Sequence, residues 1–126
     1  MDIIPERYPL RSRSQSKSYG QYALGRLIRN IYGQVVILEE FPVPDERLFL
    51  DFYLPHHNLV FEYHGVQHDQ FNKFFHVNQR GFQNSQARDG RKKQWCEIND
   101  IVLVEVRGSP TSQELQVLIQ DARKHE

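Results

Sequence analysis

Apolar and polar residues along this chain fall into segments whose periods predict a helix followed by three strands. Residues 18–32 carry apolar side chains at helical spacing, between a Ser18–Gln21 capping box and a stop at Gly33. Three runs rich in β-branched, leucine and aromatic residues follow the helix and are predicted as strands: residues 35–41, 47–54 and 59–64.

Side-chain alternation in the second and third runs places two carboxylates inside apolar strands. A short turn at Pro55 joins these runs, so an antiparallel hairpin is expected. Alternation puts Asp51 on one face with Phe49 and Tyr53, and Glu62 on one face with Val60 and His64, so both acids sit mid-strand amid apolar neighbours. In the second run, four apolar side chains are expected to share one face: Leu48, Leu50, Phe52 and Leu54. On adjacent strands, Asp51 and Glu62 are expected to be close neighbours.

The rest of the chain completes an order of helix, three strands, helix, strand and helix. Residues 65–78 show no regular period. The remaining elements are a basic helix, an apolar strand and an amphipathic helix that starts with a Thr111–Glu114 capping box: residues 79–98, 101–106 and 111–125. The order α-β-β-β-α-β-α predicts a mixed α/β (α+β) fold with one mixed sheet of about four strands, flanked by helices. A basic, flexible arm over residues 1–15 is expected to precede a single domain over residues 16–126.

Composition excludes several classes of protein. The 126 residues suit one domain, and the 16 basic and 16 acidic residues exclude a uniformly basic coating protein. The single cysteine excludes an internal disulfide framework and a cysteine-rich zinc module. The chain has no apolar run of membrane-spanning length and no recognisable secretory leader. An intracellular, reducing (cytoplasmic) location without a membrane partner is therefore expected.

The neutral total conceals two basic segments. Residues 1–33 carry six basic residues against two acidic ones, and residues 71–95 carry six basic residues against Asp89 alone. Such segments are expected either to be solvated faces or to bind the phosphate backbone of a nucleic acid. The candidate nucleic-acid-binding residues are Arg11, Arg13, Lys17, Arg88, Arg91, Lys92 and Lys93.

Buried carboxylates are costly unless they are paired with a base, protonated or bound to a metal. Two of them on adjacent strands suit Mg²⁺, which takes oxygen ligands and activates water for phosphodiester hydrolysis. The alternative is that Asp51 and Glu62 pair with Arg47, Arg107 or another base. The histidines offer a separate alternative, a structural zinc site drawn from one set: His56, His57, His64, His68 and His76.

Four segments together carry the signature of a known family. They are D-F-Y-L-P at residues 51–55, E-Y-H-G-V-Q-H at residues 62–68, an Asp-bearing basic helix at residues 89–93 and an apolar strand at residues 101–106. Over residues 16–106 the chain resembles the PD-(D/E)XK nuclease superfamily, in particular the branch of the very short patch repair endonucleases, related homing endonucleases and small uncharacterised nuclease-like domains. The resemblance implies a restriction-endonuclease-like fold and a DNA endonuclease that uses Mg²⁺ or Mn²⁺ to hydrolyse phosphodiester bonds.

The resemblance also implies roles for individual residues. The expected metal ligands are Asp51, Glu62 and the main-chain carbonyl of Tyr63. His68 would act as the general base, a role that the near-neutral pKa of histidine suits. Asp89 would hold that histidine, with Asp69 as its rival, and Gln67 would bond a phosphate or a water.

Two positions depart from the family's pattern. His64 stands where the superfamily carries its catalytic lysine, and Gln21 stands where related domains often carry a glutamate in the first helix. Both are therefore candidate site positions with altered chemistry. Two alternatives stay open, a catalytically inactive module that binds DNA or protein, and a ribonuclease. The sequence is compatible with a monomer or a homodimer.

Overall fold

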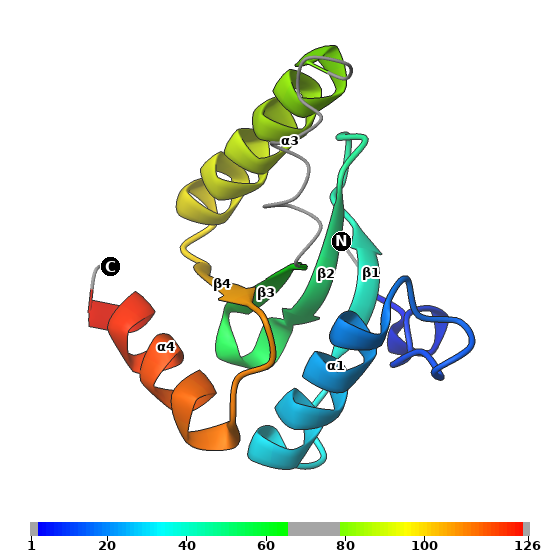
Figure 1. Ribbon diagram of the computed structural model, residues 1–126, viewed down its shortest axis with the longest axis vertical. Coiled ribbons are helices and arrows are strands. Elements are labelled where there is room, and N and C mark those ends of the chain that lie inside the picture. Colours follow the sequence, from blue (N-terminus) through cyan, green and yellow to red (C-terminus); the bar gives the residue numbers. More distant parts are fainter. Residues whose placement is uncertain (1–2, 66–78, 125–126) are drawn as a thin grey trace.

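The observed elements follow the order that the sequence predicts. A computed structural model describes residues 3–65 and 79–124, coloured along the chain in Figure 1. Its α-helices and strands are α1 (Tyr19–Tyr32), β1 (Leu38–Pro42), β2 (Phe49–Leu54), β3 (Leu59–His64), α3 (Gln79–Ile98), β4 (Val102–Arg107) and α4 (Ser112–Lys124). Two short 3-10 turns are added, η1 (Pro5–Arg7) and η2 (Pro55–His57). The mixed α/β fold and the order α-β-β-β-α-β-α are confirmed.

The four strands form one mixed sheet in the order β1-β2-β3-β4. The β1–β2 and β2–β3 pairs are antiparallel, and β4 lies parallel to β3. A parallel neighbour requires a crossover connection, and α3 lies in the segment that makes it. One core packs between the sheet and helices α1 and α4, and a second packs under α3 on the opposite face. The sheet therefore separates α3 from α1 and α4 (Figure 1).

Local hydrogen bonds explain where the first and last helices begin and end. The Ser18 hydroxyl accepts a hydrogen bond from the Gln21 backbone N–H at 3.1 Å, and α1 ends at Gly33, whose φ of 70° favours glycine. At α4 the predicted capping box closes in both directions, at 2.9 and 3.1 Å, between Thr111 and Glu114. The predicted box at α1 closes in one direction only, because the Gln21 side chain bonds elsewhere.

The predicted alternation of β2 is wrong at its centre. Leu50 packs in the core under α3, whereas Phe52 packs in the core under α1 and α4, so the apolar side chains do not share one face. The switch occurs at Asp51. On β1, Glu40 lies between the partners of Leu50 and Phe52 and has a φ of 54°, a backbone conformation that is rare for a non-glycine residue. This irregularity lets Leu50 and Asp51 both lie toward α3.

The N-terminal segment, predicted as a flexible arm, makes specific contacts with the sheet. The Tyr8 carbonyl accepts a hydrogen bond from the Glu39 backbone N–H at 3.0 Å, and the Tyr8 ring meets the Phe41 ring edge-on. The Arg11 backbone N–H donates to Glu39 Oε1 at 2.7 Å, and Leu10 packs against the core under α1. The segment therefore covers the outer edge of β1, which would otherwise present unpaired backbone groups.

The only cysteine and the helices bear on two further classes of function. Cys96 is 1% exposed, and burial raises the pKa of its thiol to about 12. Such a thiol is a poor nucleophile. In the described part of the chain, no helix combines the length and the apolar character needed to cross a bilayer.

Candidate functional site

Most of the predicted site residues that the structure describes meet at one polar cavity. It has a volume of about 250 Å³ and is lined by residues of β2, β3 and α3, with Lys17 from the segment before α1 and two residues that precede β2. Its acidic and imidazole side chains are Asp51, Glu62, His64 and Asp89. Its basic side chains are Lys17, Arg47, Arg88 and Lys92, and Leu48, Phe49 and Tyr63 complete the lining.

The cavity exists because β2 and β3 separate at the two carboxylates. Ladder pairing ends at Phe52 and Phe61, although both strands continue beyond it. The Asp51 backbone N–H donates instead to Glu62 Oε2 at 2.7 Å, and the Tyr63 backbone N–H donates to Asp51 Oδ2 at 2.8 Å. Each carboxylate thus satisfies a backbone donor of the neighbouring strand, which would otherwise be buried without a partner. The expectation that Asp51 and Glu62 are neighbours is correct.

Lys92 is the basic partner of the buried glutamate. Its Nζ lies 2.6 Å from Glu62 Oε1, and the lysine side chain is only 16% exposed. Burial alone would lower the pKa of Lys92, but Glu62, Asp51 and Asp89 outweigh it and hold that pKa above its ordinary value. A permanent positive charge therefore stands beside Glu62, supplied by α3 rather than by position 64 of β3.

The pKa values of both buried carboxyl groups are raised. Burial, then the Glu62 charge, raises the pKa of Asp51 to about 8, against the lowering effects of the Tyr63 N–H and Lys92. Burial also raises the pKa of Glu62, although Lys92 opposes it. An additional cation at this position would relieve the repulsion between the two groups.

A third and a fourth buried acid lie behind the cavity, and sequence reasoning missed both. Gln21 Nε2 donates to Glu39 Oε2 at 3.0 Å and to Glu40 Oε2 at 3.1 Å. Lys17 Nζ lies 2.9 Å from Glu40 Oε1, and the charge of Glu40 contributes to the raised pKa of Asp51. Gln21 therefore orients acids rather than lining the cavity. The available signal was two consecutive acids within an apolar run, which cannot both face solvent.

His64 and Asp89, both predicted as site residues, line the cavity. His64 is buried, and its Nε2 lies 3.4 Å from Glu105 Oε1 on the neighbouring strand β4. Asp89 lies on α3, where its charge acts on Lys92. The structure thus brings both groups to the carboxylates, and their chemical roles stay predictions.

The predicted nucleic-acid-binding residues divide into two groups. Lys17, Arg88 and Lys92 line the cavity, and Arg47, which sequence reasoning had considered only as an ion-pair partner, joins them. The others lie apart from its lining: Arg11, Arg13, Arg91 and Lys93. Of these, the Arg13 guanidinium lies 5.3 Å from the centre of the Tyr19 ring, and Lys93 Nζ lies 3.8 Å from Glu105 Oε2.

Several predicted residues fall outside the described ranges, namely Gln67, His68, Asp69 and His76. Within those ranges the histidines do not gather as the zinc alternative requires. The His57 ring packs against the Tyr32 ring at the η2 turn, at the opposite end of β3 from His64. No grouping of three or more metal-ligating side chains occurs in the part of the chain that the structure describes.

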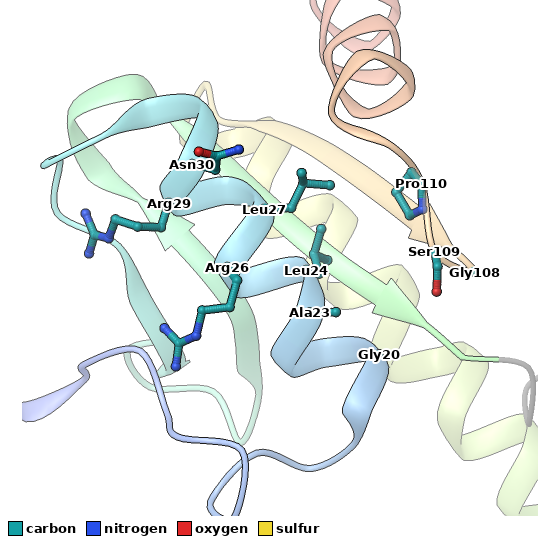
Figure 2. A pocket seen from close by; sticks show the side chains of 10 residues that line it. All are labelled: Gly20, Ala23, Leu24, Arg26, Leu27, Arg29, Asn30, Gly108, Ser109 and Pro110. Atoms are coloured by element: carbon teal, nitrogen blue, oxygen red, sulfur yellow. The ribbon is translucent and has the colours of Figure 1, made fainter.

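Three larger hollows lack a pair of buried carboxylates such as Asp51 and Glu62. One, of about 560 Å³, lies between α1 and the segment from Gly108 to Pro110. Figure 2 shows Leu24 and Leu27 on the side of α1 that faces Pro110, with Arg26 pointing the other way. Another, of about 730 Å³, lies beside Cys96 and β4. The third, of about 680 Å³, is lined by Arg107 and the first turns of α4. The polar cavity is therefore the candidate site, although it is the smallest of these four hollows.

Comparison with known proteins identifies similarity to uncharacterised viral sequences. Uncharacterized protein 033L of Invertebrate iridescent virus 3 is 42% identical over 65 residues, which are 52% of this chain and 34% of the viral protein. Uncharacterized protein 307L of Invertebrate iridescent virus 6 is 42% identical over 59 residues, 47% of this chain and 30% of that protein. The chain spans about a third of the length of these curated relatives. It matches no protein-family model and no solved structure.

Proposed function

We propose that this chain is a metal-dependent endonuclease that hydrolyses phosphodiester bonds of DNA. The observation that carries the proposal is the meeting of the Asp51 and Glu62 carboxylates on diverging strands, at a cavity bordered by basic side chains. Such carboxylates suit a hard cation, and the basic border suits phosphate groups. The signature segments at residues 51–55 and 62–68 support the same function.

The donor set fits a hard divalent cation better than zinc. Asp51, Glu62 and the main-chain carbonyl of Tyr63 would offer oxygen ligands only, which suit Mg²⁺ or Mn²⁺. Because protein carboxylates would fill few positions, water or phosphate oxygens would complete the coordination. When bound, the metal supplies polarisation of the phosphate and a water of lowered pKa.

The chain's own basic residues would bind and neutralise the substrate. Arg47 and Arg88 border the cavity from the hairpin and from α3, and would hold phosphate oxygens. Lys92, fixed at Glu62, would offer the permanent positive charge for the phosphate as negative charge develops on it. His68 stays the predicted general base.

A plasmid-nicking assay tests the function. The purified protein should convert supercoiled DNA to the nicked form with Mg²⁺ or Mn²⁺, and EDTA should stop the reaction. Asp51→Asn should lower the rate by about two orders of magnitude or more, because it removes a charged ligand. Asp121→Asn, a matched change of an exposed acid on α4, should leave the rate unchanged.

Three results would contradict this function or its site. Failure to cut single-stranded, mismatched, branched and duplex DNA with either metal would exclude the endonuclease. Cleavage of RNA alone would indicate a ribonuclease instead. Full activity of Asp51→Asn would exclude the assigned site.

One observation favours a second function, a nucleic-acid-binding module without catalysis. Lys92 already neutralises Glu62, as a base that replaces a metal would. Thermal unfolding with increasing Mg²⁺ separates the two functions, because an ion bound to the folded state raises Tm. The nuclease predicts a rise in the wild type that Asp51→Asn abolishes. If Mg²⁺ changes the Tm of the wild type and of Asp51→Asn equally, and the wild type binds DNA without cutting it, the binding module is favoured.

A further inference from the structure

An exposed aromatic ring stands at the polar cavity. Phe49 lines the cavity and is 51% exposed, whereas its neighbours Leu48 and Leu50 are buried in the core under α3. Phe49 begins β2 and pairs in register with Pro42. The ring therefore contributes less than its neighbours to the core, and its position on a strand of the sheet holds it beside the two carboxylates.

The exposure of Phe49 is notable because of where the ring lies, not because of how large the exposed fraction is. Other large apolar side chains are exposed in the described part of the chain: Ile4, Tyr19, Ile98, Val117 and Leu118. None of these five lines the polar cavity, whereas Phe49 does. Isolated apolar residues on a surface need no explanation, but an aromatic ring among charged groups at a candidate site does.

Two arginines border the same cavity from opposite sides. Arg47 lies two residues before Phe49 on the hairpin, and Arg88 lies on α3. Neither forms a salt bridge with another residue of the described ranges, whereas Lys17 and Lys92 are paired with Glu40 and Glu62. The cavity therefore combines two uncompensated guanidinium groups with one accessible ring. Guanidinium groups bind phosphates, and an aromatic face stacks on a base.

We propose that Phe49 stacks on an unpaired base next to the phosphate that Arg47 and Arg88 hold, so that the site takes single-stranded or locally unpaired DNA. The inference rests on the proposed function, because it assigns a substrate class to the same cavity. In a regular duplex each base is already stacked between its neighbours and paired. A base reaches the ring only when it is unpaired or leaves the stack, and mismatched or single strands make that least costly.

Equilibrium binding in a cleavage-silent background tests the inference. The protein is Asp51→Asn, and the probe is a single-stranded oligonucleotide with one 2-aminopurine, whose fluorescence falls when the base stacks on an aromatic ring. Phe49→Ala should weaken binding of the single strand by about tenfold and remove the quenching. Phe49→Trp should restore both. Binding of the matched duplex should change by less than about twofold, because its bases stay within the stack.

Matched controls separate stacking from a general loss of surface. Ile98→Ala removes an apolar side chain that is 73% exposed on α3, outside the cavity lining, and should change neither affinity nor quenching. Circular dichroism and the thermal unfolding midpoint should show that Phe49→Ala stays folded. If Phe49→Ala is folded and keeps both the affinity and the quenching, the inference is wrong. If Phe49→Ala loses affinity equally for the single strand and the duplex, the inference is also wrong. Stacking on an unpaired base predicts a larger loss of affinity for the single strand.

The outcome is distinguishable from failure of the proposed function. If the wild type cuts no nucleic acid but Phe49→Ala loses the quenching, the stacking site stands and the endonuclease does not. If the wild type cuts DNA and Phe49→Ala keeps its preference for unpaired over paired substrate, the endonuclease stands and the stacking site does not.

Discussion

The two ends of the β2–β3 pair show how one hairpin holds both a closed core and an open site. At the end near η2, Phe52 faces Phe61 and Leu54 faces Leu59 across regular ladder pairs, and all four side chains are fully buried. At the other end, backbone donors bond to carboxylates, and the strands border a polar cavity. The closed end stabilises the fold by apolar burial, and its rigidity holds the costly polar end in place.

The difference lies in how each end satisfies its buried groups. The closed end has only apolar side chains to bury, so ladder hydrogen bonds are sufficient. At the open end, burial raises the pKa of Glu62, and burial together with the Glu62 charge raises the pKa of Asp51. Buried charges of this kind lower stability and are typical of functional sites. Four measurements test this comparison, beginning with the largest expected effect.

Phe52→Ala should have the largest effect on stability, because it leaves a cavity in the closed end. A fully buried phenylalanine replaced by alanine lowers the free energy of unfolding by about 3–5 kcal/mol. Urea unfolding followed by circular dichroism measures this loss. Phe49→Ala, the same change at a half-exposed position of the same strand, should cost about 1 kcal/mol or less. Similar losses for the two variants would refute the distinction between the ends.

Lys92→Met should lower the free energy of unfolding by about 2–3 kcal/mol at neutral pH, because it leaves the buried Glu62 charge without its partner. Burial then holds the pKa of Glu62 above its ordinary value, so the folded state binds a proton that the unfolded chain releases. Stability should therefore recover as the pH falls toward the ordinary glutamate pKa. Adding Glu62→Gln should remove most of the loss, and additive losses would exclude the pairing.

Asp51→Asn should raise the free energy of unfolding of the metal-free protein by about 1–2 kcal/mol at pH 8. The pKa of Asp51 is about 8 in the folded state against 3.8 for the ordinary group, so the folded state binds more protons between these values. Stability from this group is thus fully present below the ordinary pKa of 3.8 and is lost as the pH rises through about 8. Asparagine can still accept the Tyr63 N–H. If the free energy of unfolding of Asp51→Asn depends on pH as that of the wild type does, the raised pKa of Asp51 is contradicted.

Gly20→Ala should have the smallest effect on stability, about 1 kcal/mol, but should move a residue of the open end. An added Cβ would lie 1.9 Å from the Tyr63 hydroxyl oxygen, so the tyrosine ring must shift. The far end of a tyrosine can move without unfolding the helix. NMR shifts confined to Tyr63 and the cavity residues would match this expectation, whereas a large loss of helix content would contradict it.

Much of the fold follows from local sequence patterns. Helical and strand periods predict the seven regular elements in their order, because apolar periodicity reports which face of an element is buried. The pattern also identifies Asp51 and Glu62, since a charged residue in an apolar strand requires a partner. Alternation fails at the centre of β2, because the left-handed backbone of Glu40 lies on another strand and leaves no local signal.

The sequence by itself therefore determined the order of the elements, the antiparallel hairpin and the two acids at its centre. Only the tertiary structure decided which of several basic residues reaches Glu62, that Glu39 and Glu40 stand behind the site, and that Arg47 and Phe49 share a cavity with Arg88. The reason is physical. Periodicity is set within one element, whereas these contacts depend on how the hairpin, the N-terminal segment and α3 pack across the sheet.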